Sequence, residues 1–233
     1  HGVDVNYKKA IEWYKKAAEQ GQVDAQYNLG FMYKRGHGVD VNYKKAIEWY
    51  KKAAKQGHAN AQYNLGAMYH HGHGVDMNYK MAFKWYEKAA EQGYANAQYN
   101  LGTMYQHGHG VDVNHKMAFE WYEKAVEQEH ANAQYNLGVM YQHGHGVDMN
   151  HKKAIEWWEK AAEQGHAAAQ YNLGAMYCYG DGVDVDYKEA IEWYEKAAEQ
   201  GHAKAQFNLG GMYDSANLAC FEPNDSKAMR WYA

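Results

Sequence analysis

The residues of this chain that could most readily do chemistry are histidines, which recur in pairs around a glycine. The pairs are His71-Gly-His73, His107-Gly-His109 and His143-Gly-His145. Zinc takes about four ligands at roughly 2.0 to 2.3 Å. Copies of a helical unit pack about 10 Å apart, so equivalent histidines cannot share one ion. The pattern predicts adventitious or pH-responsive histidines, and neither a metal site nor a cofactor.

Other motifs that could carry chemistry are incomplete. The Gly-His-Gly-Val-Asp loops lack the preceding strand and the Gly-Lys-Ser/Thr ending of a phosphate-binding loop. Asp40-x-Asn42 lacks the glycine and the closing glutamate of a calcium loop. Cys178 and Cys220 show no metal or redox spacing, which predicts two free thiols compatible with a reducing compartment.

Composition narrows the class of protein further. The formal net charge is −4, and acidic and basic residues alternate, so no basic footprint for nucleic acid or an anionic membrane is present. No apolar run is long enough to span a bilayer. Catalysis would need polar residues outside any repeat, and the only non-repeating stretch is 214–226, so we expect no enzyme. No targeting signal is visible, and His1 lies inside a repeat, which predicts a fragment of unspecified localisation.

The elements that must position these residues repeat along the chain. Tryptophan recurs every 36 residues, and the last one, Trp231, arrives two residues late. The regular positions are Trp13, Trp49, Trp85, Trp121, Trp157 and Trp193. A fixed period of this length indicates stacked structural units, each too small to bury its apolar face alone.

Each unit contains two helical patterns joined by a glycine loop. In residues 42–57, apolar side chains follow the 3.6-residue period, Asn42 is a favourable N-cap and Gly57 a favourable left-handed end. In residues 59–71, a helical wheel centred on Leu65 turns Ala61, Gln62, Met68 and Tyr69 toward the partner helix. Gly66 in this helix predicts a close approach by a bulky ring.

Stacking of such pairs predicts an all-α, α/α superhelical solenoid of antiparallel helix pairs. We expect one array over 1–233: a lone second-type helix at 1–20, full repeats at 22–57, 58–93, 94–129, 130–165 and 166–201, and a divergent, truncated repeat at 202–233.

The recurring strings LGxMY, GxGV and WYxKAAEQG resemble the Sel-one-like repeat (SLR), a relative of the tetratricopeptide repeat. This resemblance covers the whole chain, and it implies a right-handed superhelix that acts as an adaptor or scaffold for protein complexes. Three departures stand out. Glu129 replaces a helix-ending glycine, the GxGV loop is lost at 214–223 with Asp225 in place of Tyr or His, and the disulfide of some secreted members has no counterpart in each repeat.

The outward side of the first helices is the predicted binding face, because copies differ there. In tetratricopeptide-like folds the equivalent face lines the concave groove, so the resemblance implies the same location. The candidate residues are Tyr27, Asn28, Phe31, Lys34, Arg35, Tyr63, Asn64, His70, Tyr99, Asn100, Thr103, Tyr135, Asn136, Val139, Tyr171, Asn172 and Tyr179.

Two interpretations of the tyrosines and asparagines stay open. They form ladders, one pair in each repeat, that either contact a ligand or only link adjacent first helices. We expect the partner to be another protein or an extended peptide, with no nucleic acid and no membrane insertion. The alternative function is a structural array that self-associates head to tail into filaments.

Overall fold

The structure, a computed structural model, describes residues 5–214. These residues form twelve helices and no strand, which confirms the all-α solenoid of helix pairs. The helices are α1 (Tyr7–Glu19), α2 (Val23–Arg35), α3 (Tyr43–Lys55), α4 (Ala59–His71), α5 (Tyr79–Glu91), α6 (Ala95–His107), α7 (His115–Val126), α8 (Ala131–His143), α9 (His151–Glu163), α10 (Ala167–Tyr179), α11 (Tyr187–Glu199) and α12 (Ala203–Asp214).

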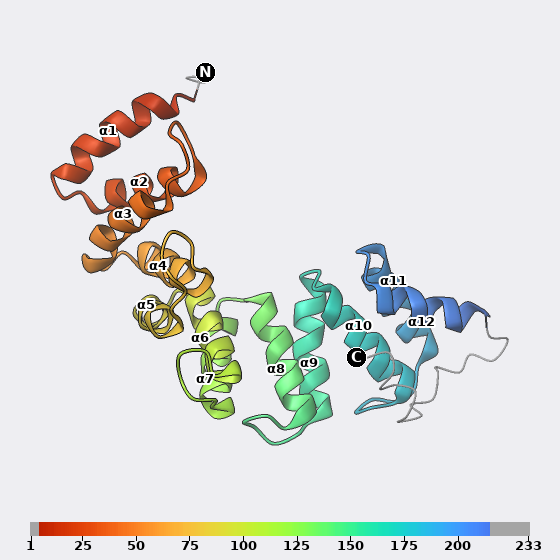
Figure 1. The fold of residues 1–233 in the computed structure, drawn as a ribbon. Helices are drawn as coiled ribbons and strands as arrows, with labels where there is room; N and C mark the ends of the chain where they lie inside the picture. The colour runs from red at the N-terminus through yellow and green to blue at the C-terminus, as the bar shows by residue number, and fades with distance from the viewer. Residues whose placement is uncertain (1–4, 215–233) are drawn as a thin grey trace. The chain divides into compact units, whose positions relative to one another are not determined.

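The chain divides into two compact units, His1–Gln128 with α1 to α7 and Glu129–Ala233 with α8 to α12. Within each unit a helix packs mainly against its neighbours in sequence, as Figure 1 shows. Even-numbered helices are the first helices of the repeats, and odd-numbered helices are the second helices. The division into a single array with the boundaries given above stays a prediction.

Second helices form as their sequence pattern predicts. The side chain of Asn42 accepts a hydrogen bond of 2.9 Å from the backbone N–H of Lys45, which caps the start of α3. Ile47 and Tyr50 are buried on one face. Gly57 follows the helix with a φ of 90°, in the left-handed region. Both predicted ends of this helix are therefore confirmed.

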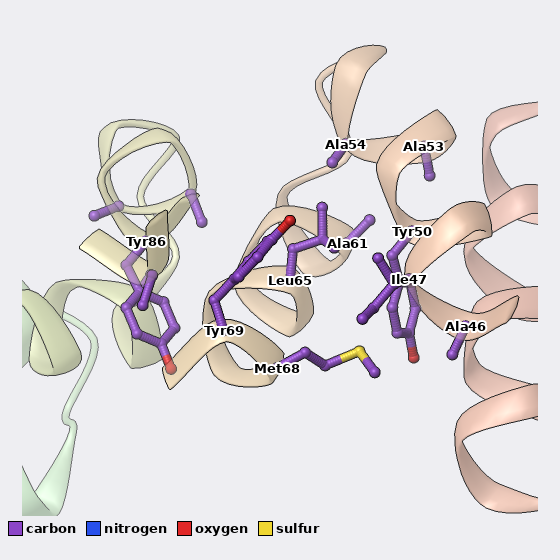
Figure 2. Packing of buried hydrophobic residues seen from close by; sticks show 14 of the residues in the cluster. Ala46, Ile47, Tyr50, Ala53, Ala54, Ala61, Leu65, Met68, Tyr69 and Tyr86 are labelled. Carbon is purple, nitrogen blue, oxygen red and sulfur yellow. The ribbon is translucent and has the colours of Figure 1, made fainter. Parts of the chain in front are cut away.

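The first helix α4 lies between the second helices on either side of it, α3 and α5. Leu65 and Met68 of α4 are 0% exposed. Figure 2 shows Leu65, Met68 and Tyr69 between Tyr50 of α3 on one side and Tyr86 of α5 on the other. The predicted inward face of the first helix is thus confirmed.

Glycine inside the first helix allows this close packing. A Cβ added at Gly66 would lie 2.6 Å from Cδ1 of Tyr86, a distance that real Cβ atoms do not reach. The ring therefore occupies the space that a side chain at position 66 would need, which confirms the predicted close approach. Trp158 occupies the same place opposite Gly138 in α8. Burial of a large ring offsets the low helix propensity of glycine.

The Gly-His-Gly loop joins a repeat to the repeat before it. The ring of His73 stacks on Tyr43 at the start of α3, with 5.4 Å between ring centroids. Two further pairs repeat this contact: Tyr7 with His37 at 4.8 Å and Tyr79 with His109 at 4.6 Å. Gly74, with a φ of 74°, brings the loop against Tyr43. Histidines of this loop therefore have a packing role that the sequence did not reveal.

A relay of glutamine side chains crosses joints between repeats within each unit. Gln62 of α4 is only 4% exposed, and its Nε2 donates to the backbone oxygen of Ala54 at 3.1 Å. Its own Oε1 accepts from Nε2 of Gln92 at 2.6 Å. The backbone N–H of Gly57 also donates to the Ala54 oxygen, at 3.1 Å, so the relay adds a second hydrogen bond at the end of α3. Gln26 and Gln170 make the same pair of contacts in their repeats.

Two departures from the repeat have structural outcomes. Glu129 keeps the left-handed conformation of the glycine that it replaces, with a φ of 57°, and α7 ends at Val126 after 12 residues instead of 13. The expectation of two free thiols is wrong, because Cys178 is disulfide-bonded. Cys220, the lost loop at 215–223 and Asp225 lie outside the described residues.

Candidate binding face on the first helices

The predicted binding residues lie on α2, α4, α6, α8 and α10. All of them are half-buried except Tyr171, which is buried, and Arg35, which is exposed. They do not belong to the inward face that Leu65 and its equivalents occupy. Each first helix therefore has a second, partly accessible side, and the question is what that side contacts.

The ladder tyrosines are packed between repeats. The ring of Tyr27 stacks on His58, the residue that precedes α4, at 4.5 Å, and lies 5.8 Å from the ring of Tyr50. Tyr135 stacks on His166 at 4.6 Å in the same way. Burial raises the pKa of the Tyr135 phenol, and a hydrogen bond with Asn172 opposes that rise. These rings hold adjacent repeats together, whatever else they contact.

The ladder asparagines also link neighbouring first helices. Oδ1 of Asn64 accepts from Nζ of Lys34 at 2.9 Å, and its Nδ2 donates to the backbone oxygen of Asn60 at 2.8 Å. Asn64 is also hydrogen-bonded to Tyr27. Burial raises the pKa of Tyr63, and its hydrogen bond with Asn100 opposes that rise. The geometry therefore favours the interpretation that the ladders connect helices.

The positions that differ between copies lie on the same face as the ladders. Phe31, Thr103 and Val139 occupy the same place in three first helices, and all are half-buried. The hydroxyl of Thr103 donates to the backbone oxygen of Tyr99 at 3.2 Å. The guanidinium of Arg35 lies over the ring of Phe31, 5.9 Å from its centroid. Size and polarity at this place therefore change from repeat to repeat.

The charge of the face also changes along unit 1. Lys34 is half-buried, and burial lowers the pKa of its amine, with the nearby Arg35 guanidinium as a second cause. In the next repeat the equivalent residue is His70. The centroid of its ring lies 5.1 Å from that of Tyr79 and 6.1 Å from that of His109. Burial lowers the pKa of His70. Cationic side chains thus give way to aromatic and neutral ones.

Histidines before the first helices have a role that the sequence analysis missed. Nδ1 of His58 accepts from the backbone N–H of Ala61 at 3.2 Å, and His166 caps α10 through Ala169 at the same distance. His130 and His202 cap α8 and α12. Histidine is not among the residues usually expected at an N-cap. A sequence signal for these caps was nevertheless present, because His directly precedes the Ala-x-Ala-Gln that begins the first helix in four copies.

The opposite surface carries a pattern that is the same in every repeat. Each second helix places a lysine over a tryptophan three residues earlier. The pairs are Trp13 with Lys16, Trp49 with Lys52, Trp85 with Lys88, Trp121 with Lys124, Trp157 with Lys160 and Trp193 with Lys196, at 3.8 to 5.3 Å. Repetition of one cation–π contact offers a partner little to distinguish one repeat from another.

Residues 5–214 can also be considered as a metal site or a membrane span. No group of three or more His, Cys, Asp or Glu side chains in this range is placed to hold a metal ion. Over the same range, every helix is too short or too polar to cross a membrane. The non-repeating stretch 214–226, which the sequence analysis singled out for catalysis, lies outside the described residues beyond Asp214.

Together the helix pairs, the glycine loops and the repeated joints define a tandem-repeat helical solenoid. The Sel1 repeat profile matches residues 1–22, 23–58, 59–94, 95–130, 131–166, 167–202 and 203–233. The chain therefore belongs to the Sel1 repeat family, as the resemblance in its sequence predicted. Members of this family commonly act as scaffolds for protein interactions.

Solved structures agree with this assignment. A protective antigen of uropathogenic Escherichia coli strains, which displays an SLR fold, is 38% identical with a TM-score of 0.89, and the match covers 100% of this chain and 50% of that one. This chain thus spans half the length of that relative. A Sel1 repeat protein from Oxalobacter formigenes is 35% identical with a TM-score of 0.84, covering 97% and 90%.

A more distant neighbour shows the fold alone. The immunity protein PA5088 from Pseudomonas aeruginosa is 24% identical with a TM-score of 0.52, covering 84% of this chain and 72% of that one. A search of curated proteins returned no match.

Proposed function

We propose that this chain is a protein-binding scaffold that holds an extended peptide segment of another protein against the outward face of its first helices. The observation that carries the proposal is the contrast between two sets of residues on that face. The tyrosines and asparagines are constant and engaged between repeats, whereas Phe31, Thr103 and Val139, which are also half-buried, differ from copy to copy. Recognition needs distinct features, and only the second set supplies them.

An extended ligand suits this surface. Packed helices lie about 10 Å apart, and three extended residues cover about the same distance, so each repeat would meet a new stretch of peptide. Phe31 and Arg35 would accept apolar and acidic side chains, while the next repeats offer aromatic and polar contacts. Contributions from several repeats would add to give specificity. The face of each unit is expected to bind in this way by itself.

A peptide selection tests the proposal. The probe is a random library of peptides of about 12 residues, long enough to cross three or four first helices. The changes Phe31→Ser, Arg35→Ala and Thr103→Ala should weaken binding of selected peptides at least about tenfold, a loss of about 1.4 kcal/mol. Far-UV circular dichroism should remain unchanged, because none of the three residues is fully buried.

A matched variant on the second helices provides the control. Glu48→Ser, Lys84→Ala and Glu120→Ala remove three exposed side chains from α3, α5 and α7. Peptide binding should not change in this variant. If the control variant loses binding and the first-helix variant retains it, the binding site lies on the second helices and the proposed face is wrong.

A further inference from the structure

The structure shows a difference between the caps of the two kinds of helix. Second helices are capped by asparagine, or in α11 by aspartate: Asn6, Asn42, Asn78, Asn114, Asn150 and Asp186. Four first helices, α4, α8, α10 and α12, are capped instead by histidine. A histidine can accept this hydrogen bond only while Nδ1 carries no proton. We propose that the histidine caps make the first helices, and not the second helices, loosen at acid pH.

Geometry ties the caps within each unit to the joint between repeats. The ring of His166 caps α10 and stacks on Tyr135 of α8 at 4.6 Å. The ring of His202 caps α12 and stacks on Tyr171 of α10 at 4.7 Å. Protonation at Nδ1 removes an acceptor from the helix and places a positive charge at its N-terminus, where the helix dipole is also positive. One titration therefore weakens both the helix start and its contact with the previous repeat.

Charged groups lie near two of the capping rings, those of His202 and His58. Lys204 faces His202 and, after burial, is a further cause of its lowered pKa. Burial lowers the pKa of His166 and of His130. At His58, Oδ1 of Asp24 lies 3.4 Å from Nε2. The pKa is lowered by burial at the caps of α8, α10 and α12, so we expect these three helices to respond.

The sign of the pH dependence follows from the lowered pKa values of His130, His166 and His202. An unfolded histidine takes up its proton near pH 6.5, whereas these folded rings resist it. The unfolded chain then binds more protons than the folded chain as the pH falls, so stability decreases below about pH 6.5. Above that pH both states are neutral and the caps contribute in full.

The test replaces the caps with a side chain that caps without titrating. Changing His58, His130, His166 and His202 to Asn keeps a strong N-cap acceptor. The control variant changes the exposed histidines His71, His107 and His145 to Gln, which removes three imidazoles that cap no helix. The melting temperature of each chain is measured at pH 7.5 and 5.5. We expect the fall in the wild type to shrink by at least half in the asparagine variant and to persist in the control.

The chain also contains an internal comparison. Tyr94 precedes α6 and makes no side-chain cap. Hydrogen exchange, corrected for the intrinsic effect of pH, should become about fivefold faster in the first turn of α10 at pH 5.5, the factor expected for one lost cap. The first turn of α6 should not change. A pH-dependent fall in melting temperature that is the same in the wild type and the asparagine variant would overturn the proposal, as would equal changes in α6 and α10. Both measurements use the free chain, so their outcome is independent of peptide binding.

Discussion

Single residues decide how each helix ends and how closely two helices approach. Glu129 is the only residue other than glycine with a positive φ in the part of the chain that the structure describes. The sequence predicted strain there or a different helix exit, and the chain keeps the left-handed conformation at 57°. Left-handed backbone costs a residue with a Cβ about 1 to 2 kcal/mol.

Replacement of Glu129 by Gly should therefore stabilise the chain. We expect the free energy of unfolding to rise by about 0.5 to 1 kcal/mol, because the strain is removed at the cost of a more flexible unfolded chain. Urea denaturation monitored by tryptophan fluorescence measures the change. Glu129→Ala serves as the control and should give no gain, since alanine has the same conformational restriction.

Gly66 in the first helix α4 cannot be replaced by a larger residue without a clash, in contrast to Glu129, where glycine would relieve strain. Gly66→Ala places a methyl group against the ring of Tyr86, which should destabilise the fold by about 1 to 3 kcal/mol through overpacking. The control is Asn132→Ala, at an exposed position of α8. This change should be neutral or stabilising by up to about 1 kcal/mol, because alanine favours a helix. Thermal unfolding of both variants checks the pair, and equal losses would mean that the ring contact is unimportant.

At the scale of elements, the joint between a second helix and the next first helix depends on a buried polar relay. Gln62→Leu would remove two hydrogen bonds, one to the carbonyl of Ala54 and one from the amide of Gln92, which keep their contacts with Gly57 and Lys88. A hydrogen bond contributes about 0.5 to 1.5 kcal/mol, so we expect a loss of about 1 to 3 kcal/mol for the two in chemical denaturation. Gln92→Ala removes the exposed member and should cost less than about 1 kcal/mol. If both changes had small effects, apolar packing alone would account for the joint.

Helix bounds could be predicted well because they depend on local chemistry. The expected helix at 59–71 is α4, Ala59–His71, since its glycine end and apolar stripe lie within the segment itself. Contacts between repeats could not be predicted from such rules. Lys34 meets Asn64, and Tyr27 meets His58, across 30 and 31 residues of sequence. Nothing in one segment specifies which side chain of the next repeat completes the contact.

The candidate face was predicted in position but only partly in role. Lys34, Arg35 and Phe31 lie on the accessible side of α2, as the helical wheel indicated. Tyr27 and Asn64 proved to be engaged between repeats, an alternative that sequence alone left open because the same residues suit both roles. Binding at this face remains a prediction.

At the scale of the whole molecule, repetition of the joint has a consequence for how the chain can change length. Removal of residues 58–93 would bring Gln98 against the end of α3, where Ala54 occupies the place that Ala90 now holds. The new junction would be chemically the same as the one it replaces. We expect the shortened chain to fold with the same helicity per residue and a moderately lower melting temperature, because one set of neighbour contacts is lost.

Deletion of half a unit is the contrasting experiment. Without residues 58–75 two second helices would follow one another, and no glutamine would reach the carbonyls of the first, so circular dichroism should show a loss of cooperative unfolding. A gene for such a protein can therefore gain or lose copies by recombination in steps of one whole repeat. The repeats on either side of each new junction would still fit together. Because the same glutamine relay forms at each new junction, we expect chains with a different number of whole repeats to fold.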